Sequence, residues 1–155
     1  MKLLYTLVIS FAFSQVYACN TDKGLNTAKE ENIISKADSM KLKITIGEKT
    51  ATAVLYDNPA SKDFASLLPL TLQLEDYNNT EKVATLSKKL STQSAPAGFD
   101  PSIGDLTYYA PWGNIALFYK DFGYSNGLVS MGKITSGIEA FTVKGPVSVE
   151  IALEK

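Results

Sequence analysis

The side chains that most often carry proton transfer and anion binding are missing from this chain. Its 155 residues include no histidine, and lysine accounts for all 15 basic residues, so arginine is absent as well. Imidazole is the usual group for proton transfer near neutral pH, and guanidinium is the usual bidentate ligand of carboxylates and phosphates. Ser-His-Asp and Cys-His nucleophilic sites, and the zinc and haem sites that need histidine, are therefore excluded.

The carboxylates that remain are not arranged as a catalytic pair. Glu75 and Asp76 are adjacent in a segment with strand-like alternation, so their side chains point to different faces. Asp100 and Asp105 flank a loop. A glycosidase needs one acid in an apolar setting that faces a second carboxylate. We therefore expect these acids to be solvated surface groups.

One phosphate-loop spacing is present but lacks its key residue. The segment Gly127–Lys133 has the G-x4-G-K pattern, yet Ile134 stands where a magnesium-binding serine or threonine is needed. A turn followed by a strand is the better interpretation. A buried lysine could still act as a nucleophile, and Lys120 and Lys133 are the nearest to the aromatic residues, although exposed strand lysines are the simpler expectation.

The segment Leu106–Tyr124 is dense in aromatic residues and contains the only tryptophan of the chain. It predicts a hairpin in which 106–110 pairs with 114–120 across Pro111-Trp112-Gly113. Alternation then places Ile115, Leu117 and Tyr119 on one face, with Ala116 and Phe118 on the other. Because both faces are apolar, we expect a barrel wall that is covered on its outside by a loop or helix.

These aromatic residues are the candidates for ligand contact. Tyr108 and Tyr109 are neighbours in one strand and must point opposite ways, so at least one hydroxyl should lie near solvent or a cleft. Trp112 lies in the turn, where an exposed ring often contacts a ligand, although a packed corner is the alternative. We expect the ligand-binding residues to be Tyr108, Tyr109, Trp112, Phe118 and Tyr124.

The start of the chain has the organisation of a secretory signal. Met1-Lys2 is positive, and Leu3–Phe13 is a mostly apolar run too short for a stable transmembrane helix. Signal peptidase I could cut after Ala18 and leave Cys19 as a free thiol. Alternatively, the segment Val16–Cys19 resembles a bacterial lipobox, in which the cysteine is acylated. We expect the second, because the lone cysteine stands at the cleavage point; a buried amino-terminal helix is disfavoured by the polar residues that follow.

Three regions follow from this organisation. Residues 1–18 are expected to be a lipoprotein-type signal peptide, residues 19–39 a polar tether, and residues 40–155 a β-rich domain. The predicted partner is a membrane, through lipid on Cys19, which places the chain in the bacterial cell envelope. A secreted or periplasmic soluble protein is the alternative. The net charge of −1 gives no broad basis for binding nucleic acid.

The β-rich domain is recognised by its period of two. Apolar and polar residues alternate from Met40 onward, with turn residues between the runs. A helix is expected over 57–68, ended by Pro69. Residues 81–90 fit a helix or a strand, and 91–104 should be a long surface loop. We expect strands at 40–46, 50–56, 70–74, 106–110, 114–120, 128–134 and 147–153, with a short helical turn at 136–141.

Two motifs resemble a known family. The segments Gly104–Tyr119 (GDLTYYAPWGNIALFY) and Leu128–Phe141 (LVSMGKITSGIEAF), followed by an alternating strand, resemble the small prokaryotic cyclophilin-like domains. Gly132-Lys133-Ile134-x-x-Gly137 resembles the segment before the last strand of true cyclophilins. The resemblance covers about Met40 to Glu154. It implies a mainly β fold, a closed barrel of about eight strands with one or two short capping helices.

The resemblance does not carry isomerase activity with it. Prolyl isomerases of this fold use an arginine that hydrogen-bonds the twisting amide, and this chain has none. We therefore expect no catalytic residues, no cofactor and no metal. The leading hypothesis is a cell-envelope lipoprotein whose barrel binds a small molecule or peptide. A weak peptidyl-prolyl isomerase or folding helper, and an accessory subunit that docks a larger envelope protein, are the alternatives.

Overall fold

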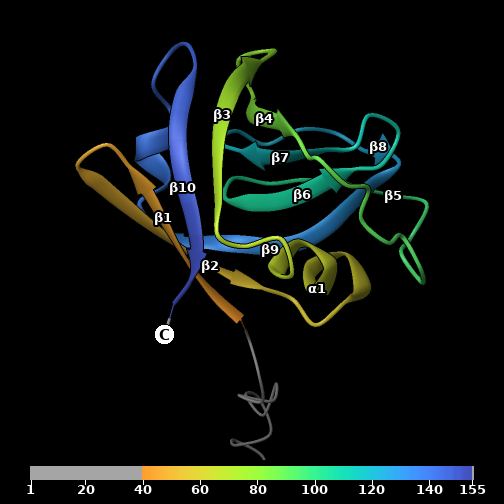
Figure 1. Ribbon diagram of the computed structural model, residues 1–155. Helices are drawn as coiled ribbons and strands as arrows, with labels where there is room; N and C mark the ends of the chain where they lie inside the picture. The colour runs from red at the N-terminus through yellow and green to blue at the C-terminus, as the bar shows by residue number, and fades with distance from the viewer. Residues whose placement is uncertain (1–39, 155) are drawn as a thin grey trace, which may run out of the picture. The chain divides into compact units, whose positions relative to one another are not determined.

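The strands that the alternation predicts close into a barrel. The computed structural model describes residues 40–154, so the predicted signal peptide, Cys19 and the predicted tether lie outside the described residues. Within them, eight strands close in the order β1-β10-β3-β4-β7-β6-β9-β2 (Figure 1). The expected mainly β fold, with a closed barrel and a short capping helix, is confirmed.

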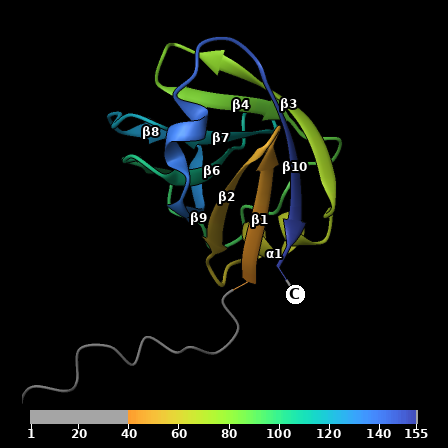
Figure 2. The ribbon, with the colours of Figure 1, turned by 90° about the vertical axis from the view of Figure 1, so that its left-hand side faces the viewer.

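The first two strands form the expected hairpin. Strand β1 (Met40–Ile46) pairs with β2 (Lys49–Leu55) across a turn in which Gly47 has φ of 57°. Leu42 and Ile44 are buried inside the barrel, whereas Lys41 and Lys43, which alternate with them, are exposed. The strict alternation of β1 therefore fixes which face is wet. Figure 2 shows β1 beside both of its partners, β2 and β10 (Val147–Leu153).

The helix α1 (Pro59–Ala65) is attached to the barrel through its cap. The Asn58 Oδ1 accepts a hydrogen bond from the Ser61 backbone N–H at 2.9 Å, which satisfies a free donor of the first turn. The Asn58 Nδ2 donates to the Ser130 carbonyl oxygen at 3.0 Å, and Phe64 is fully buried. Cap and core contact together hold α1 against β9 (Leu128–Ser136).

The helix is shorter than the sequence predicts. The sequence predicts a helix over 57–68, but α1 ends at Ala65. Beyond that point the hydrogen bonds change to three-residue spacing, from Leu67 N to Phe64 O at 3.0 Å and from Leu68 N to Ala65 O at 3.2 Å. This tighter turn ends the helix before Pro69 is reached.

The segment that fitted either a helix or a strand forms a strand. Strand β4 (Glu81–Thr85) pairs with β3 (Leu70–Tyr77) on one side and with β7 (Asn114–Phe118) on the other. Asn78 and Asn79 have φ of 52° and 53°, the left-handed geometry that a tight hairpin needs. Pairing on both edges therefore decides a local sequence that is ambiguous by itself.

The aromatic segment forms the predicted hairpin. Strand β6 (Asp105–Tyr109) pairs with β7 and with β9, and a 3-10 turn η1 (Ile138–Phe141) leads on towards β10. The expected long loop contains one short strand, β5 (Gly98–Phe99), which pairs with β8 (Ser125–Asn126). These two short strands lie at the right of Figure 1. They form a separate two-stranded sheet rather than part of the barrel.

Apolar side chains pack on both sides of the β6–β7 wall, as the sequence predicts. Ile115 and Leu117 belong to the barrel interior, whereas Ala116, Phe118 and Leu128 form a second cluster. The outer face of this wall is therefore partly covered by other side chains of the domain and is not exposed to water alone. In the described part of the chain, no helix has the length and apolar character needed to span a membrane.

Candidate functional site

A hollow lies on the outer face of the wall formed by β3, β4, β7 and β6, and the strand register explains it. The first row across the strands is Tyr77, Glu81 and Phe118, which are direct partners. Two residues further along, the partners Val83 and Ala116 are small. The small pair forms the floor of a pocket of about 200 Å³, and larger side chains rise on both sides of it.

The far wall of the hollow is the next row of the same face. Asn114 pairs with Tyr109, and Tyr109 pairs with Leu128. Asn114 and Phe118 are four residues apart on β7, so the two walls are about 13 Å apart along the strand. This pocket, with Phe122 and Ser125 from the loop beyond β7, is called the outer-wall pocket below.

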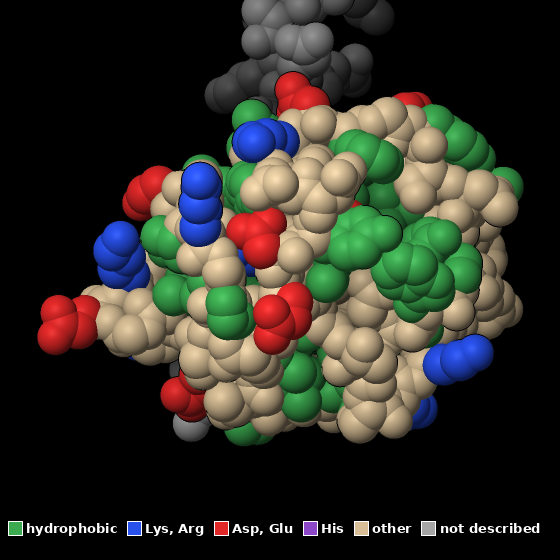
Figure 3. Space-filling view, turned by 90° about the horizontal axis from the view of Figure 1, so that it is seen from above, with side chains coloured by type: hydrophobic (Ala, Val, Ile, Leu, Met, Phe, Trp, Pro, Cys, Tyr) green, Lys and Arg blue, Asp and Glu red, His purple; other side chains and the backbone are tan. Residues whose placement is uncertain are grey.

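Aromatic rings enclose the outer-wall pocket. The Trp112 ring contacts Tyr77 at 5.6 Å between centroids and Tyr109 at 5.3 Å, both edge to face with interplanar angles of 82°. Trp112 thus spans the two walls, yet 59% of its surface is exposed. The rings of Phe118 and Phe122 stack at 6.2 Å. In the view from above, hydrophobic side chains gather towards the right, whereas most carboxylates lie to the left (Figure 3).

Two buried acceptors in this pocket have no partner. Glu81 is 9% exposed and Asn114 is 5% exposed. Among the described residues nothing hydrogen-bonds Glu81 Oε2 or Asn114 Oδ1, although Asn114 Nδ2 donates to the Ile115 carbonyl oxygen at 3.1 Å. Burial raises the pKa of Glu81 to about 7. A buried acceptor of this kind costs about 1–3 kcal/mol unless a donor from water or a ligand reaches it.

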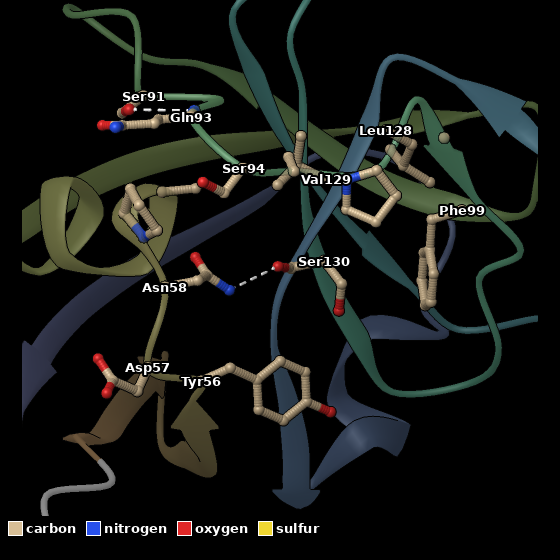
Figure 4. A pocket seen from close by; sticks show the side chains of 15 residues that line it. Tyr56, Asp57, Asn58, Ser91, Gln93, Ser94, Phe99, Leu128, Val129 and Ser130 are labelled. Atoms are coloured by element: carbon tan, nitrogen blue, oxygen red, sulfur yellow. Dashed lines mark hydrogen bonds between the residues drawn. The ribbon is translucent and has the colours of Figure 1, made fainter.

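A larger pocket adjoins the outer-wall pocket at Leu128. Its volume is about 420 Å³, and its lining comes from the α1 cap, the 91–99 segment and β9. Phe99 and Leu128 lie on one side and Asn58 and Ser94 on the other (Figure 4). The Asn58 amide already donates to Ser130 and accepts from Ser61. This pocket therefore offers apolar surface beside the outer-wall pocket, without an unmet acceptor of the same kind.

The structure brings three of the five sequence-predicted ligand residues together. Tyr109, Trp112 and Phe118 line the outer-wall pocket. Tyr108 does not, because it points into the barrel, where it is 1% exposed and its hydroxyl accepts a hydrogen bond from Leu90 N at 3.2 Å. Tyr124 lines none of the pockets described above; its ring covers Gly98 in β5. Tyr108 and Tyr124 therefore do not belong to the lining of the outer-wall pocket.

Sequence reasoning missed eight of the eleven residues that line the site, among them four with large polar or aromatic side chains. Tyr77, Glu81, Asn114 and Phe122 line the outer-wall pocket but were not candidates. A signal for Asn114 was present, since the alternation that separates Ile115 from Ala116 also places Asn114 on the outer face. Glu81 and Tyr77 depend on the β3–β4 pairing, which the sequence left undecided.

The buried lysine of the domain is one that the sequence did not single out. Lys82 Nζ is fully buried and donates at 2.7 Å to each of Asp76 Oδ2, Val143 O and Gly145 O, which uses all three protons. Its hydrogen bond lowers the pKa of Asp76. Burial, and then the hydrogen bond to Asp76, raise the pKa of Tyr119 to about 12. Lys82 therefore anchors the loop before β10 and is not a free nucleophile.

Two of the acids expected to be solvated are structural ion-pair partners. Asp76 binds Lys82, and Asp105 is 4% exposed, with Oδ1 accepting from Lys133 Nζ at 3.1 Å. Asp105 Oδ2 also accepts from Ser102 N at 2.8 Å. The solvated interpretation is wrong for these two acids because each forms an ion pair with the lysine opposite it on the neighbouring strand. Lys120 is exposed.

Phosphate and metal chemistry find no support in the described residues. The G-x4-G-K segment runs straight into β9, which pairs with β2 and β6, so it does not bend around an anion. Within residues 40–154, no cluster of three cysteine or carboxylate side chains could hold a metal ion.

The comparisons with known proteins agree on the scaffold of this site. A family model described as the cyclophilin-like family matches residues 44–152. A hypothetical protein of Archaeoglobus fulgidus, determined in solution, superposes with a TM-score of 0.53 at 18% identity; the match covers 75% of this chain and 95% of that one. At this identity the likeness shows the fold alone. None of the curated proteins compared with the chain matches it.

Proposed function

Because the chain belongs to the cyclophilin-like family, a fold that hosts more than one activity, we propose that this member is a binding module for a small molecule or short peptide segment. The site is the outer-wall pocket, and the ligand extends past Leu128 towards the larger pocket.

One observation carries this proposal. An aromatic-walled hollow contains two buried acceptors, Glu81 Oε2 and Asn114 Oδ1, that the described protein leaves without partners. Ligand pockets typically combine apolar walls with a few convergent polar groups. Trp112 supports the assignment, because a ring that is 59% exposed gains burial when a ligand enters.

The proposed role is binding without catalysis. The sequence has no histidine or arginine to act as a proton carrier or as the isomerase arginine, and its buried lysine is fully hydrogen-bonded. A protease-coupled assay with proline-containing peptides tests this directly. We expect the isomerisation rate to equal the uncatalysed rate, and a clear acceleration would replace the binding role by that of a folding helper.

The proposed location is the cell envelope, with the chain anchored by lipid on Cys19. The support is the sequence of residues 1–19 alone. Mass spectrometry of the mature amino terminus is the test. We expect an acylated Cys19 that disappears in Cys19→Ser, whereas an unmodified mature chain starting at Cys19 or elsewhere would favour the secreted or periplasmic soluble form.

A ligand screen that follows the fluorescence of the single tryptophan tests the binding function. We expect ligands to shift Trp112 emission to shorter wavelength and to raise the unfolding temperature. Val83→Phe fills the floor of the outer-wall pocket and should abolish both effects, with circular dichroism confirming that the barrel is intact. If no compound in a broad screen changes either signal, the binding site is misassigned; a large protein partner that protects Trp112 would favour the accessory-subunit alternative.

A further inference from the structure

We propose that the outer-wall pocket recognises an organic ammonium group, which binds the Glu81 carboxylate while aromatic rings surround it. The inference rests on the proposed binding function and specifies its ligand chemistry. Glu81 lies in one row with Tyr77 and Phe118, and Trp112 stands against Tyr77. A cation beside Glu81 would therefore lie close to aromatic rings as well as to the carboxylate.

The charges around the pocket favour a cation over an anion. Glu81 is the charged group of the lining, and none of the lysines lines the pocket. The other polar groups are the hydroxyls of Tyr77, Tyr109 and Ser125 and the amide of Asn114. An anionic ligand would face an unbalanced carboxylate, whereas an ammonium group supplies the charge and the donor that Glu81 lacks.

The aromatic rings are suited to the same ligand. Tyr77 and Tyr109 each meet Trp112 at an interplanar angle of 82°, so Trp112 packs edge to face against both tyrosines and the three rings do not form a flat stack. Ring faces attract ammonium groups electrostatically, and the attraction is stronger when water is excluded. A carboxylate beside such rings selects a cation carrying an apolar body over a hydrated metal ion.

The second acceptor adds a constraint on ligand length. Asn114 Oδ1 belongs to the opposite wall, about 13 Å along the strand from the row that contains Glu81. An ammonium ligand with an N–H or O–H donor near its other end satisfies both acceptors. An amine with a flexible chain and the amino terminus of a peptide share this chemistry.

The experiment compares matched cationic and neutral probes on the purified chain. At pH 8, 2-phenylethylammonium chloride and 2-phenylethanol are titrated separately, with Trp112 emission and calorimetry as readouts. We expect the amine to bind about ten- to a hundredfold more tightly, the range for a hydrogen-bonded charge. The tripeptide Phe-Gly-Gly and its amino-terminally acetylated form are the second arm, which distinguishes a free amine from a peptide terminus.

Variants assign the preference to Glu81. Glu81→Gln should reduce the amine-to-alcohol ratio to near one, and Glu81→Ala should do the same. Glu150→Gln removes an exposed carboxylate on β10, whose strand partners are Thr45 and Thr71, and should keep the wild-type ratio. Equal binding of amine and alcohol by the wild type would overturn the ammonium inference and leave the binding function standing. Binding of none of the four probes would also overturn it, and the broader ligand screen then decides the binding function separately.

Discussion

The buried carboxyl of Glu81 makes the stability of the fold depend on pH in a defined direction. Burial raises its pKa from 4.5 to about 7, since the charged form loses water and gains no partner at Oε2. Between these two values the folded protein retains a proton that the unfolded chain has released. The free energy of unfolding contributed by Glu81 therefore decreases as the pH rises through this window and is constant above it.

The size of the effect follows from the same pKa values. A rise from 4.5 to about 7 corresponds to roughly 3 kcal/mol. Glu81→Gln keeps the shape of the side chain and removes its ionisation. Relative to this variant, the wild type should lose roughly 3 kcal/mol of unfolding free energy between pH 4.5 and pH 8. Urea unfolding at a series of pH values, followed by circular dichroism, measures the difference.

The control for this measurement is a glutamate whose side chain is exposed to solvent. Glu75 is exposed on β3, next to β4, so Glu75→Gln should give a pH profile parallel to that of the wild type. The difference between the wild type and Glu81→Gln removes the contribution of every other group. Parallel pH profiles for the wild type and Glu81→Gln would show that Glu81 is solvated or paired. The unpartnered acceptor at Glu81 and the ammonium site would then both lose their basis.

Three further substitutions test the scaffold, each by the midpoint of urea unfolding. Lys82→Met should lower the free energy of unfolding by about 3 kcal/mol or more, because it leaves a carboxylate and two carbonyl oxygens without their donor. Lys88→Met on the surface should change it little, and equal effects of the two substitutions would refute the buried network. Gly132→Ala should cost about 2 kcal/mol or more, since a Cβ there collides with a carbonyl of β2, while Gly123→Ala meets no neighbouring atom. Tyr108→Phe should cost about 1 kcal/mol and leave ligand affinity unchanged, which a weakened affinity would contradict.

The sequence predicts the barrel well because most strands can be recognised from their own alternation of apolar and polar residues. In β1 the buried Leu42 and Ile44 alternate with exposed lysines, and the same period identifies β10. The β6–β7 hairpin follows from its turn residues. Alternation alone does not show which of the two sets of side chains of a strand points into the barrel. It separates Tyr108 from Tyr109, but only the closed barrel shows that Tyr108 is inside.

The site is harder to predict because its polar residues depend on pairing between strands. Residues 81–90 fit a helix or a strand by local period, and β4 exists because β3 and β7 bond to its two edges. Without that pairing, Glu81 is one more surface acid. With it, Glu81 lies between Tyr77 and Phe118 in a single row. Which polar and aromatic side chains line the pocket is therefore decided by the pairing register of β3, β4 and β7.

The position of the hollow follows from how the two faces of the wall are filled. Inside the barrel, large side chains such as Ile115 and Leu117 are almost completely buried and form the hydrophobic core. Outside, the row containing Val83 and Ala116 is too small to fill the space between its aromatic neighbours. Enlarging this row should remove the pocket without disturbing the interior, whereas enlarging an interior residue should destabilise the barrel by about 1–3 kcal/mol. The ligand proposed for this domain would therefore contact the outer side chains of the wall, which the packing of the core does not constrain.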